Sequence, residues 1–169
     1  MQSLLDPIVF AMLGISAITD LRTGRILNTV TYPAILLGLL MAATGSSSGM
    51  ASSLLGGAIG GGLLYIFFTV GWMGGGDVKL MTAVGTLKGF PFILNALFYS
   101  VFIGGIAAAL VLIWRGQLGA AMGDLVQAGQ RAATPRLAAG TIQPRGGTFP
   151  FGVAIALGTT AAVAIEWAR

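Results

Sequence analysis

The chain has 169 residues, of which 56% are hydrophobic and 8% are charged, and its formal net charge at pH 7 is +4. Because soluble domains carry about 25% charged residues, this composition excludes an ordinary soluble domain and predicts an integral membrane protein. The chain contains neither Cys nor His, which excludes disulfides, thiol nucleophiles, Ser-His-Asp triads and zinc sites with the usual ligands. Any catalysis must therefore use carboxylate, hydroxyl or lysine groups.

Six apolar segments predict helices, most of them near the roughly 20 residues that a bilayer-spanning helix needs. In chain order, these segments cover residues 4–19, 30–44, 53–72, 78–88, 92–114 and 149–167. The first segment carries Asp6 and no preceding Lys or Arg, so we expect a retained helix rather than a signal peptide. The predicted fold is an all-α polytopic bundle of about six transmembrane helices, one of them short, forming a single membrane domain over residues 1–169.

Glycines recur at helical spacing in the third segment. Gly60 follows Gly56, and Gly61 follows Gly57, by four residues in each case. Such small-residue patterns let the backbones of two helices approach closely in a membrane. We interpret these four glycines as packing positions.

Basic residues mark one side of the predicted bundle. Short cytoplasmic loops of membrane proteins are enriched in Lys and Arg, whereas the loop at 45–52 is uncharged. If the short segment 78–88 crosses the membrane, every basic loop is cytoplasmic and both termini lie outside. If it re-enters instead, four arginines fall outside, so we predict six spans, with Lys88 snorkelling to the outer interface. The basic loops contain Arg22 with Arg25, Lys79, and Arg115 with Arg131, Arg136 and Arg145.

The longest polar stretch covers residues 115–147. Leu118, Met122, Leu125 and Val126 recur there at helical spacing, which favours an interfacial amphipathic helix on the cytoplasmic surface. A plain connector is the simpler interpretation of this loop, and an element that guides a substrate is the sharper one.

Two of the five acidic residues stand at predicted helix ends on the same side. Asp20 follows the first segment, and Asp77 follows Gly74, Gly75 and Gly76 before the short segment. Two carboxyl groups a few ångströms apart cannot both ionise cheaply and can share one proton. One can then activate water as a base while the other polarises a carbonyl, which is the chemistry of aspartic proteolysis.

Other interpretations of the charged residues stay open at this point. Either aspartate can be a solvated group at a helix end, and Asp77 also suits the amino-terminal dipole of the short helix. We expect Asp6, Asp124 and Glu166 to be solvated. We expect Lys79 to be a cytoplasmic anchor rather than a proton donor beside Asp77, because positions i and i+2 of a helix face apart. A small proton-coupled transporter and a non-catalytic assembly scaffold are the rival classes; a transporter would place its acids near the bilayer midplane.

Three segments resemble one known family. Segment 74–80, Gly-Gly-Gly-Asp-Val-Lys-Leu, resembles the GxGD motif of the type IV prepilin peptidases, which are membrane aspartic proteases. Segment 20–28 is similar to the family's other aspartate motif, although Leu27 replaces the family's proline, and segment 149–156 resembles its Pro-Phe-Gly segment. Without the family's cysteine-bearing methyltransferase segment, the chain resembles the short branch that serves tight-adherence (Flp) pili.

The resemblance implies an aspartic endopeptidase that cuts prepilins or pseudopilins at the cytoplasmic face of the bacterial inner membrane, without N-methyltransferase activity. It implies that Asp20 and Asp77 are catalytic, with supporting roles for Gly74, Gly75, Gly76, Lys79, Asn28, Pro150 and Gly152. The three consecutive glycines would provide a bend and room for substrate, Asn28 would cap the second helix, and Pro150 with Gly152 would shape the cleft wall. Membrane lipid and pilus-assembly machinery are the other expected partners; no metal, cofactor or nucleic acid is expected.

Overall fold

A computed structural model describes residues 5–45, 49–69, 73–116 and 151–168, together with Gly119 and Gly123. These residues form α1 (Asp6–Thr23), α2 (Asn28–Ala43), α3 (Met50–Thr69), α4 (Gly75–Lys88), α5 (Phe92–Trp114) and α7 (Phe151–Trp167). Each predicted apolar segment corresponds to one helix, so the all-α prediction is confirmed for the described part of the chain. The expected surface helix with Leu118, Met122, Leu125 and Val126 lies outside the described residues, as do Asp124 and Pro150.

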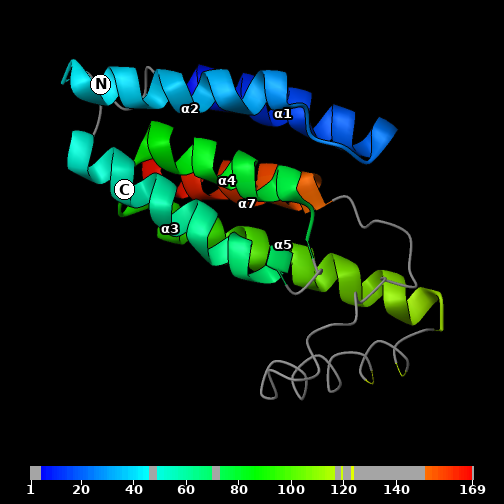
Figure 1. Cartoon of the computed structure of the whole chain (residues 1–169). Coiled ribbons are helices and arrows are strands. Elements are labelled where there is room, and N and C mark those ends of the chain that lie inside the picture. The colour runs from blue at the N-terminus through cyan, green and yellow to red at the C-terminus, as the bar shows by residue number, and fades with distance from the viewer. Residues whose placement is uncertain are drawn as a thin grey trace, which may run out of the picture.

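The shortest helix, α4, lies at the centre of the bundle. It contacts α1, α2, α3, α5 and α7, and Figure 1 shows α4 and α7 between the pair α1 and α2 and the pair α3 and α5. The side chains of α4 are correspondingly buried, with no exposed surface at Leu80, Met81, Ala83, Val84 and Leu87. Burial of apolar side chains inside a shell of other helices lets a helix this short hold its place without a lipid-facing surface.

Glycines of α3 and α4 bring these two backbones into direct contact. A Cβ atom on Gly56 would overlap the carbonyl oxygen of Gly85, and one on Gly60 would lie 2.8 Å from the carbonyl oxygen of Met81. Beside them, the Ser53 hydroxyl donates a hydrogen bond of 2.6 Å to the Thr86 carbonyl. The predicted packing role of the glycine pattern is therefore confirmed.

The ends of α1 and α4 differ from the prediction by a few residues. α1 continues to Thr23, so Asp20 lies in its last turn rather than after it, and α4 begins at Gly75, so Asp77 lies in its first turn. Gly24 ends α1 in the left-handed conformation, with φ of 63°, and donates its N–H to the Asp20 carbonyl. Both acidic side chains consequently project from regular helix rather than from loops.

The outward surfaces of the helices are apolar. By length and composition α3 and α5 are able to cross a membrane, and α2 and α7 are shorter apolar helices. Large side chains of α5 remain exposed, among them Phe98, Phe102, Leu110 and Trp114. An apolar surface this extended is costly in water, and it fits a membrane protein.

Candidate active site

The two candidate catalytic acids are both buried at one end of the bundle. Asp20 retains 8% of its surface exposed in the last turn of α1, and Asp77 retains 7% in the first turn of α4. The two carboxyl groups lie within electrostatic range of each other. Chain segments more than fifty residues apart thus bring the acidic pair together, and burial weakens the screening of charge by water.

Each carboxyl group accepts a hydrogen bond from a backbone amide. Asp20 Oδ2 accepts the N–H of Gly152, in the first turn of α7, at 2.9 Å. Asp77 Oδ2 accepts the N–H of Gly74, directly before α4, at 3.1 Å. Such bonds fix the orientation of a carboxyl group and leave its second oxygen for another partner. Three helices therefore build the site, with α1 and α4 supplying acids and α7 supplying an amide.

Close packing around the acids accounts for the glycines in this region. A Cβ atom on Gly152 would lie 2.8 Å from Asp20 Oδ2 and 3.1 Å from the Ile26 side chain. A Cβ atom on Gly76 would lie 2.9 Å from Ile26 Cβ. A Cβ atom on Gly75 would lie 3.4 Å from the Phe68 ring. The lack of a side chain at Gly75 and Gly76 makes room for the side chains of Phe68 and Ile26, and the lack of one at Gly152 makes room for the Asp20 carboxyl group.

Lys79 links α4 to α2 beside the acidic pair. Its Nζ donates a hydrogen bond of 2.9 Å to Asn28 Oδ1 and lies 5.1 Å from the centroid of the Tyr32 ring. The expected cap by Asn28 is wrong, because Leu27 occupies the N-cap position and the Asn28 side chain binds Lys79 instead. Sequence reasoning missed Tyr32, although its i+4 spacing from Asn28 places both on one face of α2.

The opposite end of the bundle holds a second charged cluster. Lys88 Nζ lies 2.7 Å from Asp6 Oδ1 and 2.8 Å from Glu166 Oε2. Trp167 Nε1 donates a hydrogen bond of 3.0 Å to Asp6 Oδ2. The predictions of a solvated Asp6 and of a snorkelling Lys88 are therefore wrong, whereas Glu166 keeps 35% of its side-chain surface exposed and also pairs with Lys88. Lys88 is 1% exposed and Asp6 is 2% exposed, because the ends of three helices meet there and buried charges need paired partners.

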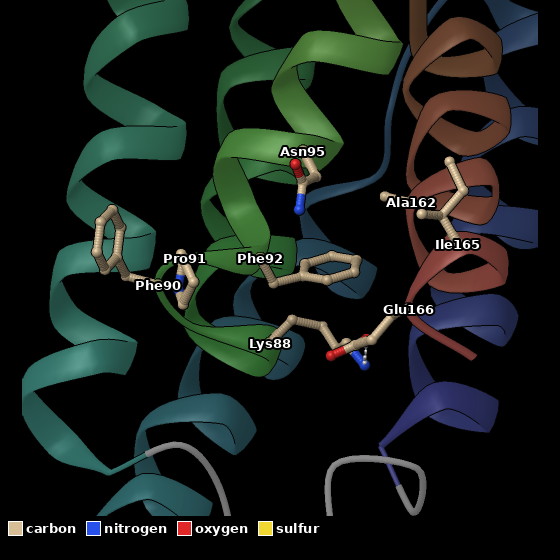
Figure 2. Close-up of a pocket in the computed structure, with 8 residues that line it drawn as sticks. All are labelled: Lys88, Phe90, Pro91, Phe92, Asn95, Ala162, Ile165 and Glu166. Carbon is tan, nitrogen blue, oxygen red and sulfur yellow. Dashed lines mark ion pairs between the residues drawn. The ribbon is translucent and has the colours of Figure 1, made fainter. Parts of the chain in front are cut away.

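A cavity of about 170 Å³ lies beside this second cluster. Figure 2 shows Lys88 and Glu166 at its edge, with Phe92 and Asn95 of α5 on one side and Ala162 and Ile165 of α7 on the other. Because Lys88 ends α4 and Asp77 begins it, the cavity is separated from the acidic pair by almost the length of α4. It is therefore distinct from the candidate active site.

The structure is a bundle of apolar helices with two neighbouring buried carboxyl groups at one end. The chain belongs to the type IV leader peptidase family, whose family model matches residues 8–109. The match contains Asp20, Asn28, Asp77 and Lys79 and ends before Gly152. The predicted family resemblance is thus confirmed.

Individual relatives cover only part of this chain and are themselves longer. A prepilin leader peptidase/N-methyltransferase of Vibrio cholerae is 30% identical over 83 residues, which are 45% of this chain and 33% of that protein. One of Burkholderia pseudomallei is 29% identical over 119 residues, which are 64% of this chain and 37% of that protein. The chain thus spans about a third of the length of these curated relatives. No solved structure matches it.

Proposed function

We propose that this protein is a membrane-embedded aspartic endopeptidase that removes the short basic leader of prepilins or pilin-like proteins. The observation that carries the proposal is the interacting pair of buried carboxyl groups of Asp20 and Asp77, in a chain of the type IV leader peptidase family. Neither a Cys nor a His nucleophile is available for a rival hydrolytic mechanism.

In the proposed mechanism the two carboxyl groups hold one proton between them. The ionised group takes a proton from water as the water attacks the scissile carbonyl carbon, and the protonated group donates a hydrogen bond to the carbonyl oxygen. The peptide C–N bond breaks when the leaving nitrogen receives the proton that the first aspartate took from water. The Gly152 and Gly74 amides support this chemistry because each holds one oxygen of an aspartate, which leaves the second oxygen for water or substrate.

We further propose six membrane spans, with the acidic pair at the cytoplasmic face of a bacterial inner membrane. The two ends of α4 meet the two ends of α1, through Asp77 with Asp20 and through Lys88 with Asp6. If α1 crosses the membrane, α4 therefore runs from one end of α1 to the other and crosses as well. The basic residues Arg22 and Arg25 follow Asp20 closely, which supports a cytoplasmic position for this end.

Cysteine labelling tests this orientation, and the absence of native cysteines makes the chain suited to it. In intact cells, Arg22→Cys is expected to be shielded from a membrane-impermeant thiol reagent, and Ser47→Cys is expected to react. Permeabilised cells should label at both positions and serve as the control. Labelling of Arg22→Cys but not of Ser47→Cys in intact cells would reverse the topology.

The proposed activity is tested by co-expressing the chain with candidate pilins and measuring the intact mass of the products. We expect the loss of a short leader, with no methyl group on the new amino terminus. A pilin of unchanged mass for every candidate, in the presence of folded protein, would overturn the proposal. A methyl group added by the purified protein and a methyl donor would overturn the part concerning methylation.

Gly152 is expected to be sensitive to a single methyl group. Gly152→Ala places a Cβ atom 2.8 Å from Asp20 Oδ2 and displaces the amide that orients this carboxyl group. We expect the rate of cleavage to fall by about tenfold to a hundredfold, because misplacement of a catalytic group by ~1 Å has effects of this size. Gly105→Ala in α5 is the control, since no atom lies within 4 Å of its added Cβ. Equal cleavage rates for Gly152→Ala and Gly105→Ala would show that Gly152 has no role in the active site.

A further inference from the structure

The cluster of Asp6, Lys88 and Glu166 joins the three helices that build the candidate active site. Asp6 begins α1, Lys88 ends α4, and Glu166 lies at the end of α7. At their other ends these helices carry Asp20, Asp77 and Gly152. Every helix with a group in the acidic site is therefore also held at the far end by a charged group.

Helix geometry places the two clusters on the same face of each helix. Fourteen residues separate Asp6 from Asp20 in α1 and Gly152 from Glu166 in α7, which is about four turns at ~3.6 residues per turn. Eleven residues separate Asp77 from Lys88 in α4, which is about three turns. Because each spacing is close to a whole number of turns, rotation or sliding of one helix would disturb both clusters together.

The burial of Lys88 makes its pairing selective for one arrangement of the helices. Lys88 is 1% exposed, so an unpaired charge there would be poorly solvated. Its Nζ also lies 4.8 Å from the centroid of the Phe92 ring, and Figure 2 shows Lys88 reaching towards Glu166 across the edge of the cavity. Buried ionic contacts can fix the register of packed helices even where they add little stability.

We propose that Lys88, Asp6 and Glu166 are positioning residues, which hold α1, α4 and α7 in the register that brings Asp20 and Asp77 together. The inference about cleavage rests on the proposed peptidase function, whereas the inference about helix register does not. The far end of the bundle thus controls the geometry of the acidic pair without touching substrate.

Two sets of variants separate register from stability. The triple variant Asp6→Asn/Lys88→Met/Glu166→Gln removes the ionic contacts but leaves no unpaired buried charge, so the fold should persist. Asp6→Ala alone is a milder variant, which removes the contacts of Asp6 with Lys88 and Trp167 while Lys88 keeps Glu166. Ser53→Ala is the matched control, because it breaks a buried hydrogen bond between α3 and α4 outside the cluster.

The position of the acidic helices can be measured directly. Nitroxide labels at Leu21→Cys in α1 and Val78→Cys in α4 lie next to the two aspartates, and pulsed electron paramagnetic resonance gives the distribution of distances between them. We expect a shifted or broadened distribution for the triple variant and for Asp6→Ala, and the parent distribution for Ser53→Ala. We also expect kcat for pilin cleavage to fall by about a hundredfold in the triple variant, with KM unchanged.

The outcomes distinguish the two proposals. A parent distance distribution in both cluster variants would overturn the positioning role, whatever their activity. A shifted distribution with parent kcat would overturn its catalytic consequence. Absence of cleavage by the unlabelled parent would count against the peptidase function, and the distance measurement would still decide whether the cluster sets helix register.

Discussion

Asp20→Asn and Asp77→Asn are each expected to reduce pilin cleavage by at least about a thousandfold, because either change removes the same catalytic unit. The double variant should then be no slower than either single variant. Asn keeps an oxygen that can accept the amide N–H of Gly152 or Gly74, so the local hydrogen bonds are expected to survive. The measurement is the initial rate of leader removal, followed by intact mass, in detergent or proteoliposomes.

Folding must be matched between these variants and the parent before their rates are compared. Membrane abundance and monodispersity in detergent serve that purpose, and Asp124→Asn is the acidic control that should retain most activity. Additive partial losses would argue against a shared proton. Normal cleavage by well-folded Asp77→Asn would contradict the peptidase assignment and would favour a transporter or an assembly scaffold.

Gly56→Ala is expected to cause a large loss of stability from a single methyl group. Its Cβ would overlap the Gly85 carbonyl oxygen and lie 2.8 Å from the Gly89 carbonyl carbon, and backbone atoms cannot rotate away as a side chain can. Overpacking of this kind costs about 1–3 kcal/mol or more, so the free energy of unfolding should fall by at least that amount. Reversible denaturant titration in micelles would measure it.

Gly62→Ala is the matched control on the same helix. No atom lies within 4 Å of its added Cβ, and Ala favours helix over Gly by ~1 kcal/mol. The control should therefore unfold at the parent midpoint or slightly above it. If both variants unfolded alike, the contact between the α3 and α4 backbones would not be a significant source of stability.

The sequence predicted the helices and the acidic pair because both depend on local signals. Each helix follows from an apolar run, and Asp20 and Asp77 stand out because the chain contains only five acidic residues. The glycine spacing in α3 also predicted close packing, since four-residue periodicity defines a helix face. These inferences need no knowledge of which helices are neighbours.

The contacts of Lys88 and Asn28 could not be predicted in the same way. Lys88 meets Asp6 and Glu166 only because the ends of α1, α4 and α7 converge, and an isolated lysine near a predicted helix end suggests a lipid interface instead. Asn28 at the start of α2 fits a helix cap, yet Lys79 of α4 takes its side-chain oxygen. Both predictions were wrong because each polar residue was interpreted only from its own segment, without the helices that pack against it.

The hydrogen bond from Gly152 to Asp20 has a consequence for biosynthesis. Its donor and acceptor are 132 residues apart, so during translation both aspartates are made long before the amide that orients Asp20. A nascent chain that ends before α7 carries the acids without this restraint. Because of this order of synthesis, insertion of the last described helix is the step that completes the acidic site. Partly synthesised chains therefore do not contain a complete acidic site.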